Sequence, residues 1–299
     1  MEVEFNVAAS GTRMIMIDGV HATEIDTDPN WNPAGKALSA LVDAYGKPEG
    51  YSLRIKTNMP PSKGLGLSGA VAVGAVVCAD RYFTLGLSRL ELVRMASKGE
   101  PSHHMDNVSA SALGGFNIVA RDASGENEAI TTFPPPADLG LAVLVPDVRK
   151  MSTEAARRFV PEQLQMTEHV RSIGRAARIA AAFANRDVRA ILETLPWDGV
   201  VEPSRANGGV YGRGVDSGFL LEEKKILLQE FHVAETISGA GPSRALWYSI
   251  SEDHKHRRKN RTGVIQPAIA LVTDRLKALG HEVREVFMTK PSSKGATIL

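Results

Sequence analysis

The alternation of apolar and polar side chains predicts a strand, a glycine-rich turn and a helix in the first third of the chain. Residues 51–57 read Tyr-Ser-Leu-Arg-Ile-Lys-Thr, which alternates apolar with polar side chains as a half-buried strand does. Residues 70–83 form an alanine-rich apolar run that is too long for a strand and fits a helix. Between them, residues 60–70 read Pro-Pro-Ser-Lys-Gly-Leu-Gly-Leu-Ser-Gly-Ala. The turn therefore leads into the N-terminus of a helix.

A glycine-rich turn at a helix N-terminus is suited to binding an anion, usually a phosphate. It leaves the first N–H groups of the helix unpaired and lets the backbone approach a ligand closely. The same turn is also explained as an ordinary strand-to-helix loop in which glycine supplies positive φ angles. The run matches neither the G-x-x-x-x-G-K-[ST] loop nor the G-x-G-x-x-G fingerprint. The turn alone therefore does not identify a nucleotide site.

Further along the chain, strands and helices follow one another without regular alternation, so the predicted fold class is α+β. The later segments with a clear pattern are residues 141–145 as a strand and residues 161–185, 219–231 and 265–279 as helices. The best boundary between two domains is the turn-rich stretch of residues 131–140, which contains Pro134, Pro135 and Pro136.

The composition is that of a globular protein with one large or two modest cores. The 299 residues are 43% hydrophobic and 23% charged, which shows no bias toward disorder. The net charge of +1 gives no reason to expect nucleic acid or a membrane surface as a partner. The one strong basic run, residues 254–261, is interpreted as a solvated loop.

Cysteine usage favours a reducing compartment, with the cytoplasm as the expected location. Cys78 is the only cysteine in the sequence, so no disulfide can form within the chain. It lies in the apolar run after the turn and is interpreted as a core residue. The sequence contains no signal-peptide pattern and no continuous apolar span of about 20 residues.

The glycine-rich turn and a second run near the C-terminus resemble two motifs of one kinase family. Residues 60–70, taken as Pro-Pro-x-x-Gly-Leu-Gly-x-Ser-x-Ala, are similar to the ATP loop of the GHMP small-molecule kinases, which include galactokinase, homoserine kinase and mevalonate kinase. Residues 237–243, Ile-Ser-Gly-Ala-Gly-Pro-Ser, resemble the third, glycine-rich motif of that family. The two motifs occur in the family's order, which argues against a chance match.

Three further segments narrow the resemblance to homoserine kinase. Residues 104–108, His-Met-Asp-Asn-Val, and the following Leu-Gly-Gly turn are similar to a segment of that enzyme. Residues 145–161 contain similar Pro-Asp and Thr-x-x-x-Arg elements, and residues 202–205, Glu-Pro-Ser-Arg, match a third segment. The resemblance covers nearly the whole chain, up to Lys294-Gly295-Ala296.

The resemblance implies a GHMP kinase-like two-lobed fold with the active-site cleft between the lobes. Residues 1–135, with the phosphate loop, would form the N-terminal lobe, and residues 136–299 would form the C-terminal lobe. The implied activity is ATP-dependent phosphorylation of the homoserine side-chain hydroxyl, a step of threonine biosynthesis, with ATP and Mg²⁺ as cofactors. The expected partner is a small-molecule substrate, without nucleic acid or membrane, and a homodimer is left open.

The resemblance also implies site residues, position by position. The nucleotide would be held by Lys63, Gly64, Leu65, Gly66, Leu67, Ser68, Gly69 and Ala70, and Mg²⁺ by Glu100. The substrate would be held by His104, Asp106, Asn107, Thr153, Arg157, Arg205, Gly239 and Gly241, of which Asp106, Arg157 and Arg205 would act in catalysis.

The arginines also have a reading that does not depend on the family. Arg157 follows Thr153 by one helical turn, so both can face one side, and with Arg205 they could clamp a carboxylate or a phosphate. An isolated arginine on a helix is otherwise usually a surface charge. Zinc at His103 and His104 is not favoured, because a third ligand at a recognised spacing is lacking.

Three departures from the family pattern predict impaired ATP chemistry. Residues 1–7 resemble the segment that normally follows the family's first motif, Ala-x-x-Ser-Ala-Asn-Leu-Gly-x-Gly-Phe-Asp, and that motif is not found. Leu67 and Ala72 stand where the family normally has serines, the second of which helps to bind Mg²⁺. Each lost charge-assisted contact costs about 1.5–3 kcal/mol, or roughly tenfold to a hundredfold in rate. Either the sequence starts downstream of a lost N-terminal piece, or the protein has left ATP chemistry. On the second account, phosphorylation of homoserine is expected to be weak or undetectable.

Two other classes of function remain open at the level of sequence. A fold that keeps its anion-binding loop and arginines could act on a phosphorylated or pyrophosphorylated substrate without ATP, by elimination or cyclisation. It could also be a catalytically silent binding protein. Fold does not decide between these functions and a kinase.

Overall fold

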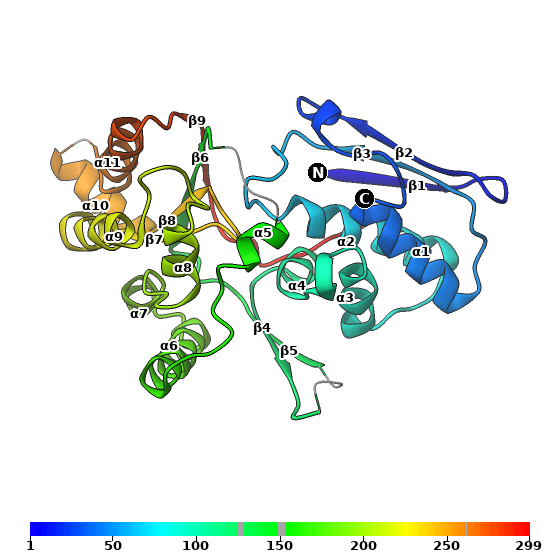
Figure 1. Cartoon of the computed structure of the whole chain (residues 1–299), viewed down its shortest axis with the longest axis horizontal. Helices are drawn as coiled ribbons and strands as arrows, with labels where there is room; N and C mark the ends of the chain where they lie inside the picture. Colours follow the sequence, from blue (N-terminus) through cyan, green and yellow to red (C-terminus); the bar gives the residue numbers. More distant parts are fainter. Residues whose placement is uncertain (125–127, 149–152, 261) are drawn as a thin grey trace. The chain divides into compact units, whose positions relative to one another are not determined.

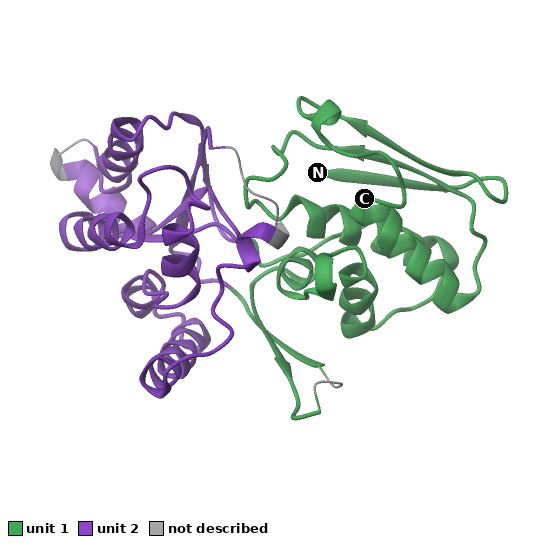
Figure 2. Ribbon diagram, in the orientation of Figure 1, with its two compact units in different colours: residues 1–134, 292–299 green, residues 135–291 purple. Residues whose placement is uncertain are grey.

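The structure, a computed structural model, describes residues 1–124, 128–148, 153–260 and 262–299 (Figure 1). Its contacts divide the chain into two compact units (Figure 2). Unit 1 comprises Met1–Pro134 and Ser292–Leu299, and unit 2 comprises Pro135–Pro291. The division made from the sequence places residues 136–299 in one lobe, whereas the last segment hydrogen-bonds within unit 1. The N–H of Gly115 donates to the carbonyl of Ser292 at 2.7 Å.

In unit 1, helices cover one face of a sheet with the strand order β1-β3-β2 (Figure 1). The strands are β1 (Glu2–Val7), β2 (Arg13–Asp18) and β3 (Tyr51–Lys56), with β1 antiparallel and β2 parallel to β3. The predicted alternation is present in β3, because Tyr51, Leu53 and Ile55 are buried while Arg54 is exposed. The buried side chains pack in one core with α1 (Pro33–Tyr45) and α2 (Leu67–Phe83).

The rest of unit 1 extends this layer of helices and adds a hairpin. Its elements are η1 (Ala22–Glu24), α3 (Arg89–Ser97), η2 (Pro101–His103), α4 (Asp106–Leu113), β4 (Phe116–Arg121) and β5 (Glu128–Phe133). Helix α2 packs against α3 and α4, and β4 pairs with β5 in antiparallel fashion. Helix α3 begins with a reciprocal capping box between Ser88 and Glu91, which satisfies backbone N–H groups at its N-terminus.

In unit 2, helices pack against an antiparallel sheet with the strand order β7-β8-β6-β9. Its strands are β6 (Leu139–Pro146), β7 (Ala234–Ile237), β8 (Arg244–Ser249) and β9 (Val283–Thr289). Helices α9 (Ser217–Phe231) and α11 (Ile265–Ala278) contact the sheet (Figure 1). Leu144, Leu227, Leu246 and Val272 share the buried core between them. The mixture of helices and mainly antiparallel strands confirms the predicted α+β class.

The remaining helices of unit 2 are α5 (Thr153–Arg157), α6 (Met166–Ala184), α7 (Val188–Thr194), α8 (Val201–Asn207) and α10 (Ile250–Asn260). Helix α10 corrects one sequence prediction, because residues 254–260 of the basic run are helical rather than a loop, and residue 261 lies outside the described residues. Acidic residues in its first turn stabilise this helix. Asp253 accepts a hydrogen bond at 2.7 Å from Nε of Arg257, which lies one helical turn further along. Among the described helices, none combines the length and apolarity needed to cross a membrane.

Candidate functional site

The loop before α2 has the alternating φ signs that are typical of anion-binding concavities. Ser62, Gly64 and Gly66 have positive φ angles of 58°, 78° and 75°, whereas Lys63 and Leu65 between them do not. Positive φ at every other residue is found in nests, in which right-handed residues between the left-handed ones turn successive N–H groups toward one point. Because α2 begins directly after Gly66, its unpaired N–H groups and helix dipole add to the same positive field. The loop therefore fits a phosphate group.

Helix α2 begins three residues earlier than the apolar run predicts. The sequence predicts a helix from residue 70, but α2 starts at Leu67 because Gly66 takes the left-handed conformation at the N-cap. The N–H of Ala70 then donates to the carbonyl of Gly66 at 3.0 Å. Ser68, Gly69 and Ala70 thus lie in the first helical turn, so their N–H groups point along the axis toward the loop.

The N-terminus of α4 adjoins the first turn of α2. A Cβ atom built on Gly69 would lie 3.1 Å from Asn107 Cβ, which is tighter than ordinary contact, so this glycine permits the close approach. Asn107 is partly buried and its Oδ1 would lie 3.9 Å from a Cβ on Gly66, whereas Asp106 is exposed and accepts the N–H of Asn107 at 2.8 Å. Within unit 1 the predicted nucleotide loop and Asn107 therefore lie together.

Glu100, the predicted Mg²⁺ ligand, comes directly after a glycine that packs tightly against α2. Its side chain is 9% exposed. A Cβ on the preceding Gly99 would lie 3.0 Å from Ala72 Cβ, so the turn before Glu100 packs directly on α2. No group of three His, Cys, Asp or Glu side chains that could hold a metal occurs among the described residues. A single carboxylate is nevertheless usual for Mg²⁺ that also binds substrate phosphates, so Glu100 fits that role.

Within unit 2, Arg205 and Arg157 lie on adjoining helices. A Cβ on Gly208, just after α8, would lie 2.4 Å from Cδ1 of Phe159, just after α5. Arg205 is partly buried, and within the described part of the chain its buried Nε–H has no hydrogen-bond partner. A buried guanidinium N–H without a partner fits an anionic ligand such as a carboxylate. Thr153 begins α5, and its side chain is outside what the structure describes.

The third motif packs closely against the ring of Tyr211. A Cβ on Gly241 would lie 2.6 Å from Tyr211 Cδ1, so only glycine allows the loop of residues 238–243 to approach so closely. Gly241 is buried and Gly239 is exposed. Burial raises the pKa of the Tyr211 hydroxyl, the nearby Glu202 carboxylate raises it further, and Arg205 opposes them. Gly241 therefore packs against Tyr211, whose hydroxyl is close enough to Arg205 to be influenced by its charge.

The core of unit 2 contains a cluster of ionisable side chains that the sequence motifs did not predict. Glu223 and Glu235 are 0% exposed and Arg244 is fully buried beside both, with Arg244 Nη1 3.3 Å from Glu235 Oε1. On α9, Glu223 and Lys224 occupy core positions between the buried Leu220 and Leu227. The sequence does contain a signal for this cluster, because ionisable residues stand at positions of the α9 pattern where apolar residues are expected. Such residues are rarely buried without a partner, so they indicate a buried polar cluster.

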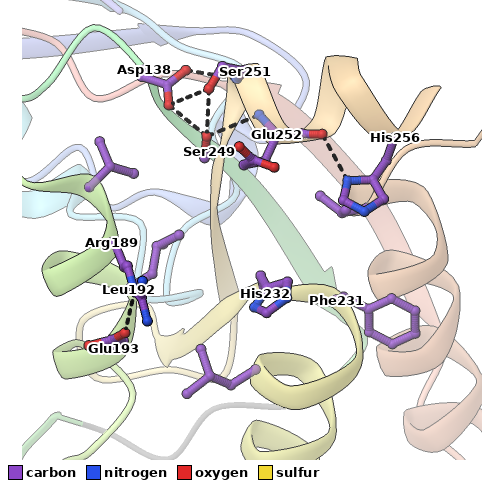
Figure 3. Close-up of a pocket in the computed structure, with 13 residues that line it drawn as sticks. Asp138, Arg189, Leu192, Glu193, Phe231, His232, Ser249, Ser251, Glu252 and His256 are labelled. Carbon is purple, nitrogen blue, oxygen red and sulfur yellow. Dashed lines mark hydrogen bonds and ion pairs between the residues drawn. The ribbon is translucent and has the colours of Figure 1, made fainter. Parts of the chain in front are cut away.

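A cavity of about 690 Å³ lies elsewhere in unit 2 (Figure 3). It is lined by Asp138, Val188, Arg189, Leu192, Glu193, Leu228, Phe231, His232, Ser249, Ser251, Glu252, His256 and Val264. Although burial raises the pKa of Asp138, hydrogen bonds from Ser249 and Ser251 outweigh it and lower that pKa below its ordinary value. Ser249 ends β8, whose first residue, Arg244, adjoins the third motif, so the cavity lies at the opposite end of the sheet from that motif. None of the predicted site residues lines it.

Comparisons with known proteins agree with the motifs. Residues 32–115 match the family described as "GHMP kinases N terminal domain". The chain is 34% identical to homoserine kinase of Thermoplasma acidophilum over an alignment of 224 residues. This alignment covers 73% of this chain and 68% of that protein. The chain is 35% identical over 233 residues to homoserine kinase of Halorubrum lacusprofundi, covering 77% and 71%. The crystal structure of homoserine kinase from Cytophaga hutchinsonii has the same fold, with a TM-score of 0.74, 21% identity, and coverage of 98% and 86%.

Proposed function

The chain belongs to the homoserine kinase family of the GHMP kinases. We therefore propose that it transfers the γ-phosphoryl group of Mg·ATP to the side-chain hydroxyl of homoserine. The observation that carries the proposal is the extent of the similarity. A span covering 73% of the chain includes residues 157 and 205 wherever it begins, so the similar region contains the segments in which the two arginines lie. The product, a phosphate ester of homoserine, belongs to threonine biosynthesis.

The nucleotide side of the reaction is assigned to unit 1. The backbone of Lys63–Ala70 would hold the phosphates, a role supported by the alternating φ signs from Ser62 to Gly66 and by the helix N-terminus that follows. Glu100 would hold Mg²⁺, which when bound neutralises charge on the β- and γ-phosphate oxygens. Asn107, which adjoins the loop, would orient the reacting group together with His104 and Asp106.

The carboxylate of the amino acid is assigned to unit 2. Arg157 and Arg205 would bind it, because a guanidinium group offers paired N–H donors that match the geometry of a carboxylate. The Nε–H of Arg205 has no hydrogen-bond partner among the described residues, which supports this role. Thr153, Gly239 and Gly241 would complete the pocket, with the glycines allowing the backbone to approach the substrate.

The reaction does not require a strong general base from the chain. Phosphoryl transfer has a loose transition state, so its rate depends mainly on positioning and on neutralising the phosphate charge. Donors already oriented by the loop and by α2 supply both effects without reorganisation. Asp106, exposed at the start of α4, would contribute by orienting the hydroxyl.

The proposal is tested by measuring ADP formation with Mg·ATP and a panel of acceptors. Homoserine should give acceptor-dependent ADP, and serine, one methylene shorter, should give at least about tenfold less, because a hydroxyl misplaced relative to the phosphate loses most of the positioning effect. Equal ADP formation with and without homoserine would contradict the proposal. Conversion of a phosphorylated substrate without nucleotide would indicate the elimination or cyclisation class instead.

A further inference from the structure

A lysine and a glutamate form a buried ion pair between α9 and α8, the helix that carries Arg205. The side chains of Lys224 on α9 and Glu202 on α8 are 5% and 13% exposed. Lys224 Nζ donates to Glu202 Oε2 and, at 2.8 Å, to the carbonyl oxygen of Pro196. Burial raises the pKa of Glu202, and Lys224 opposes that effect. Replacing such a pair by apolar residues is often neutral for stability, so stability alone does not account for it.

The same glutamate is tied to the strand that leads into the third motif. Glu202 Oε1 accepts the backbone N–H of Ile237 at 3.0 Å. Ile237 is the last residue of β7, and the loop of residues 238–243 follows it directly. One carboxylate therefore joins α8, α9 and β7. Asp198 fixes the start of α8 as well, because its Oδ2 accepts the N–H of Glu202 at 3.1 Å.

Glu202 is also close to the residues that face the proposed carboxylate site. It lies one helical turn before Arg205, so the two side chains share a side of α8. The charges of Glu202 and Arg205 both influence the pKa of the Tyr211 hydroxyl, and Gly241 packs closely against the Tyr211 ring. Glu202 thus connects Lys224 to the helix that carries Arg205 and to the last strand residue before the third motif.

We propose that Glu202 and Lys224 are positioning residues that hold Arg205 and the loop of residues 238–243 in the arrangement that binds the carboxylate of homoserine. This role rests on the proposed function, because it deepens the account of the same site. The pair touches no substrate. It fixes the helix and the strand end whose groups do, and a displacement of about 1 Å there is enough to lower the rate by up to about a hundredfold.

Kinetics of Glu202→Gln and Lys224→Met test the proposal, with Lys225→Met as the matched control. Lys225 is the exposed neighbour of Lys224 on the same helix. Both test variants should raise KM for homoserine at least about tenfold and leave KM for Mg·ATP within about twofold, whereas the control changes neither. If the test variants alter neither KM, or alter both equally, the proposal is wrong. Should Lys224→Met not fold, the double variant Glu202→Gln/Lys224→Met, which leaves no unpaired buried charge, replaces it under the same criteria.

A double-mutant cycle with Arg205 separates positioning from a general structural role. If Glu202 acts through Arg205, adding Glu202→Gln to Arg205→Lys should cost less than about threefold in kcat/KM for homoserine, because the contact it positions is already lost. Full additivity of the two substitutions would overturn the proposal.

Fluorine NMR gives a readout that does not depend on the reaction. In protein labelled with 3-fluorotyrosine, the Tyr211 resonance is assigned as the one lost in Tyr211→Phe. Glu202→Gln and Lys224→Met should shift that resonance, and Lys225→Met should not, because the Glu202 carboxylate acts on the Tyr211 hydroxyl and is held by Lys224, whereas Lys225 is exposed. An unshifted resonance contradicts the positioning role even if homoserine is phosphorylated. A shifted resonance supports that role even if homoserine is not the acceptor.

Discussion

Arg205 combines partial burial with a guanidinium Nε–H that has no hydrogen-bond partner among the described residues. A lysine at this position keeps the charge but loses the planar pair of donors that matches a carboxylate. Arg205→Lys should therefore lower kcat/KM for homoserine at least about tenfold, equivalent to about 1.4 kcal/mol. The exposed Arg213 supplies the control, since Arg213→Lys should leave the value unchanged. Unaltered kinetics in Arg205→Lys would remove Arg205 from the site.

Glu223 makes the stability of the protein depend on pH. Burial and the neighbouring Glu235 carboxylate raise the pKa of Glu223 from 4.5 to about 9 in the folded state, against the opposing effect of Arg244 and Arg275. Because the folded state then binds the proton more tightly than the unfolded state, the stabilisation is complete below about pH 4.5 and is lost progressively as the pH rises to about 9.

The free energy of unfolding of the native chain should therefore fall across this pH range, and Glu223→Gln should flatten the fall. Urea denaturation at a series of pH values measures the difference. Glu230→Gln, an exposed change on the same helix, should leave the pH dependence as it is in the native chain. Identical pH profiles for the native chain and Glu223→Gln would show that Glu223 does not retain its proton.

Leu67 and Ala72 show what sequence comparison can and cannot say at single positions. Aligned with the family motif, they read only as two lost hydroxyls. In the structure, Leu67 is 9% exposed, Ala72 is fully buried, and both belong to the core of unit 1. The motif identified the altered positions, but only the fold shows that their side chains now serve packing.

The loop before α2 allows a sharp test of phosphate binding. An added Cβ at Gly66 would strain the backbone without clashing with neighbouring atoms, so the effect of backbone strain can be measured alone. A Cβ on Gly66, at a φ of 75°, would meet only Asn107 Oδ1 at 3.9 Å. Gly86 has a similar φ of 68° in the loop after α2, with nothing within 4 Å of a Cβ. Gly66→Ala and Gly86→Ala should each lower stability by about 1–2 kcal/mol.

Only Gly66→Ala should also weaken nucleotide binding, because relief of the strained φ rotates N–H groups out of the concavity. Titration calorimetry with Mg·ATP should give a Kd raised at least about tenfold for Gly66→Ala and unchanged for Gly86→Ala. Equal affinities for the two variants would place the phosphates somewhere other than this loop.

Periodicity predicted the elements that bury one face and missed those fixed by local capping. The strand at residues 51–57 and the helices at residues 219–231 and 265–279 correspond to β3, α9 and α11. The start of α2 was wrong by one turn, because the left-handed N-cap at Gly66 is a backbone feature without an apolar signature. Helix α10 was missed because its stability comes from pairs such as Asp253 with Arg257 rather than from an apolar face.

For the molecule as a whole, contiguous motifs predicted the family and the fold, whereas the residues that brace the site came from separate elements. Glu202 meets Lys224 and Ile237 only because α8, α9 and β7 pack together. Glu223, Glu235 and Arg244 likewise come from α9, β7 and β8. Contacts between residues that far apart in sequence depend on tertiary packing, which one sequence does not reveal.

The measurement that tests the account most directly is transfer of label from γ-³²P-ATP to homoserine, followed by chromatography of the products. We expect labelled homoserine phosphate only when protein, Mg·ATP and homoserine are all present. The missing hydroxyls at positions 67 and 72 should keep turnover below the usual enzyme range of about 1–10³ s⁻¹. If no labelled ester forms, while a phosphorylated substrate is converted without nucleotide, the central claim of a homoserine kinase is contradicted.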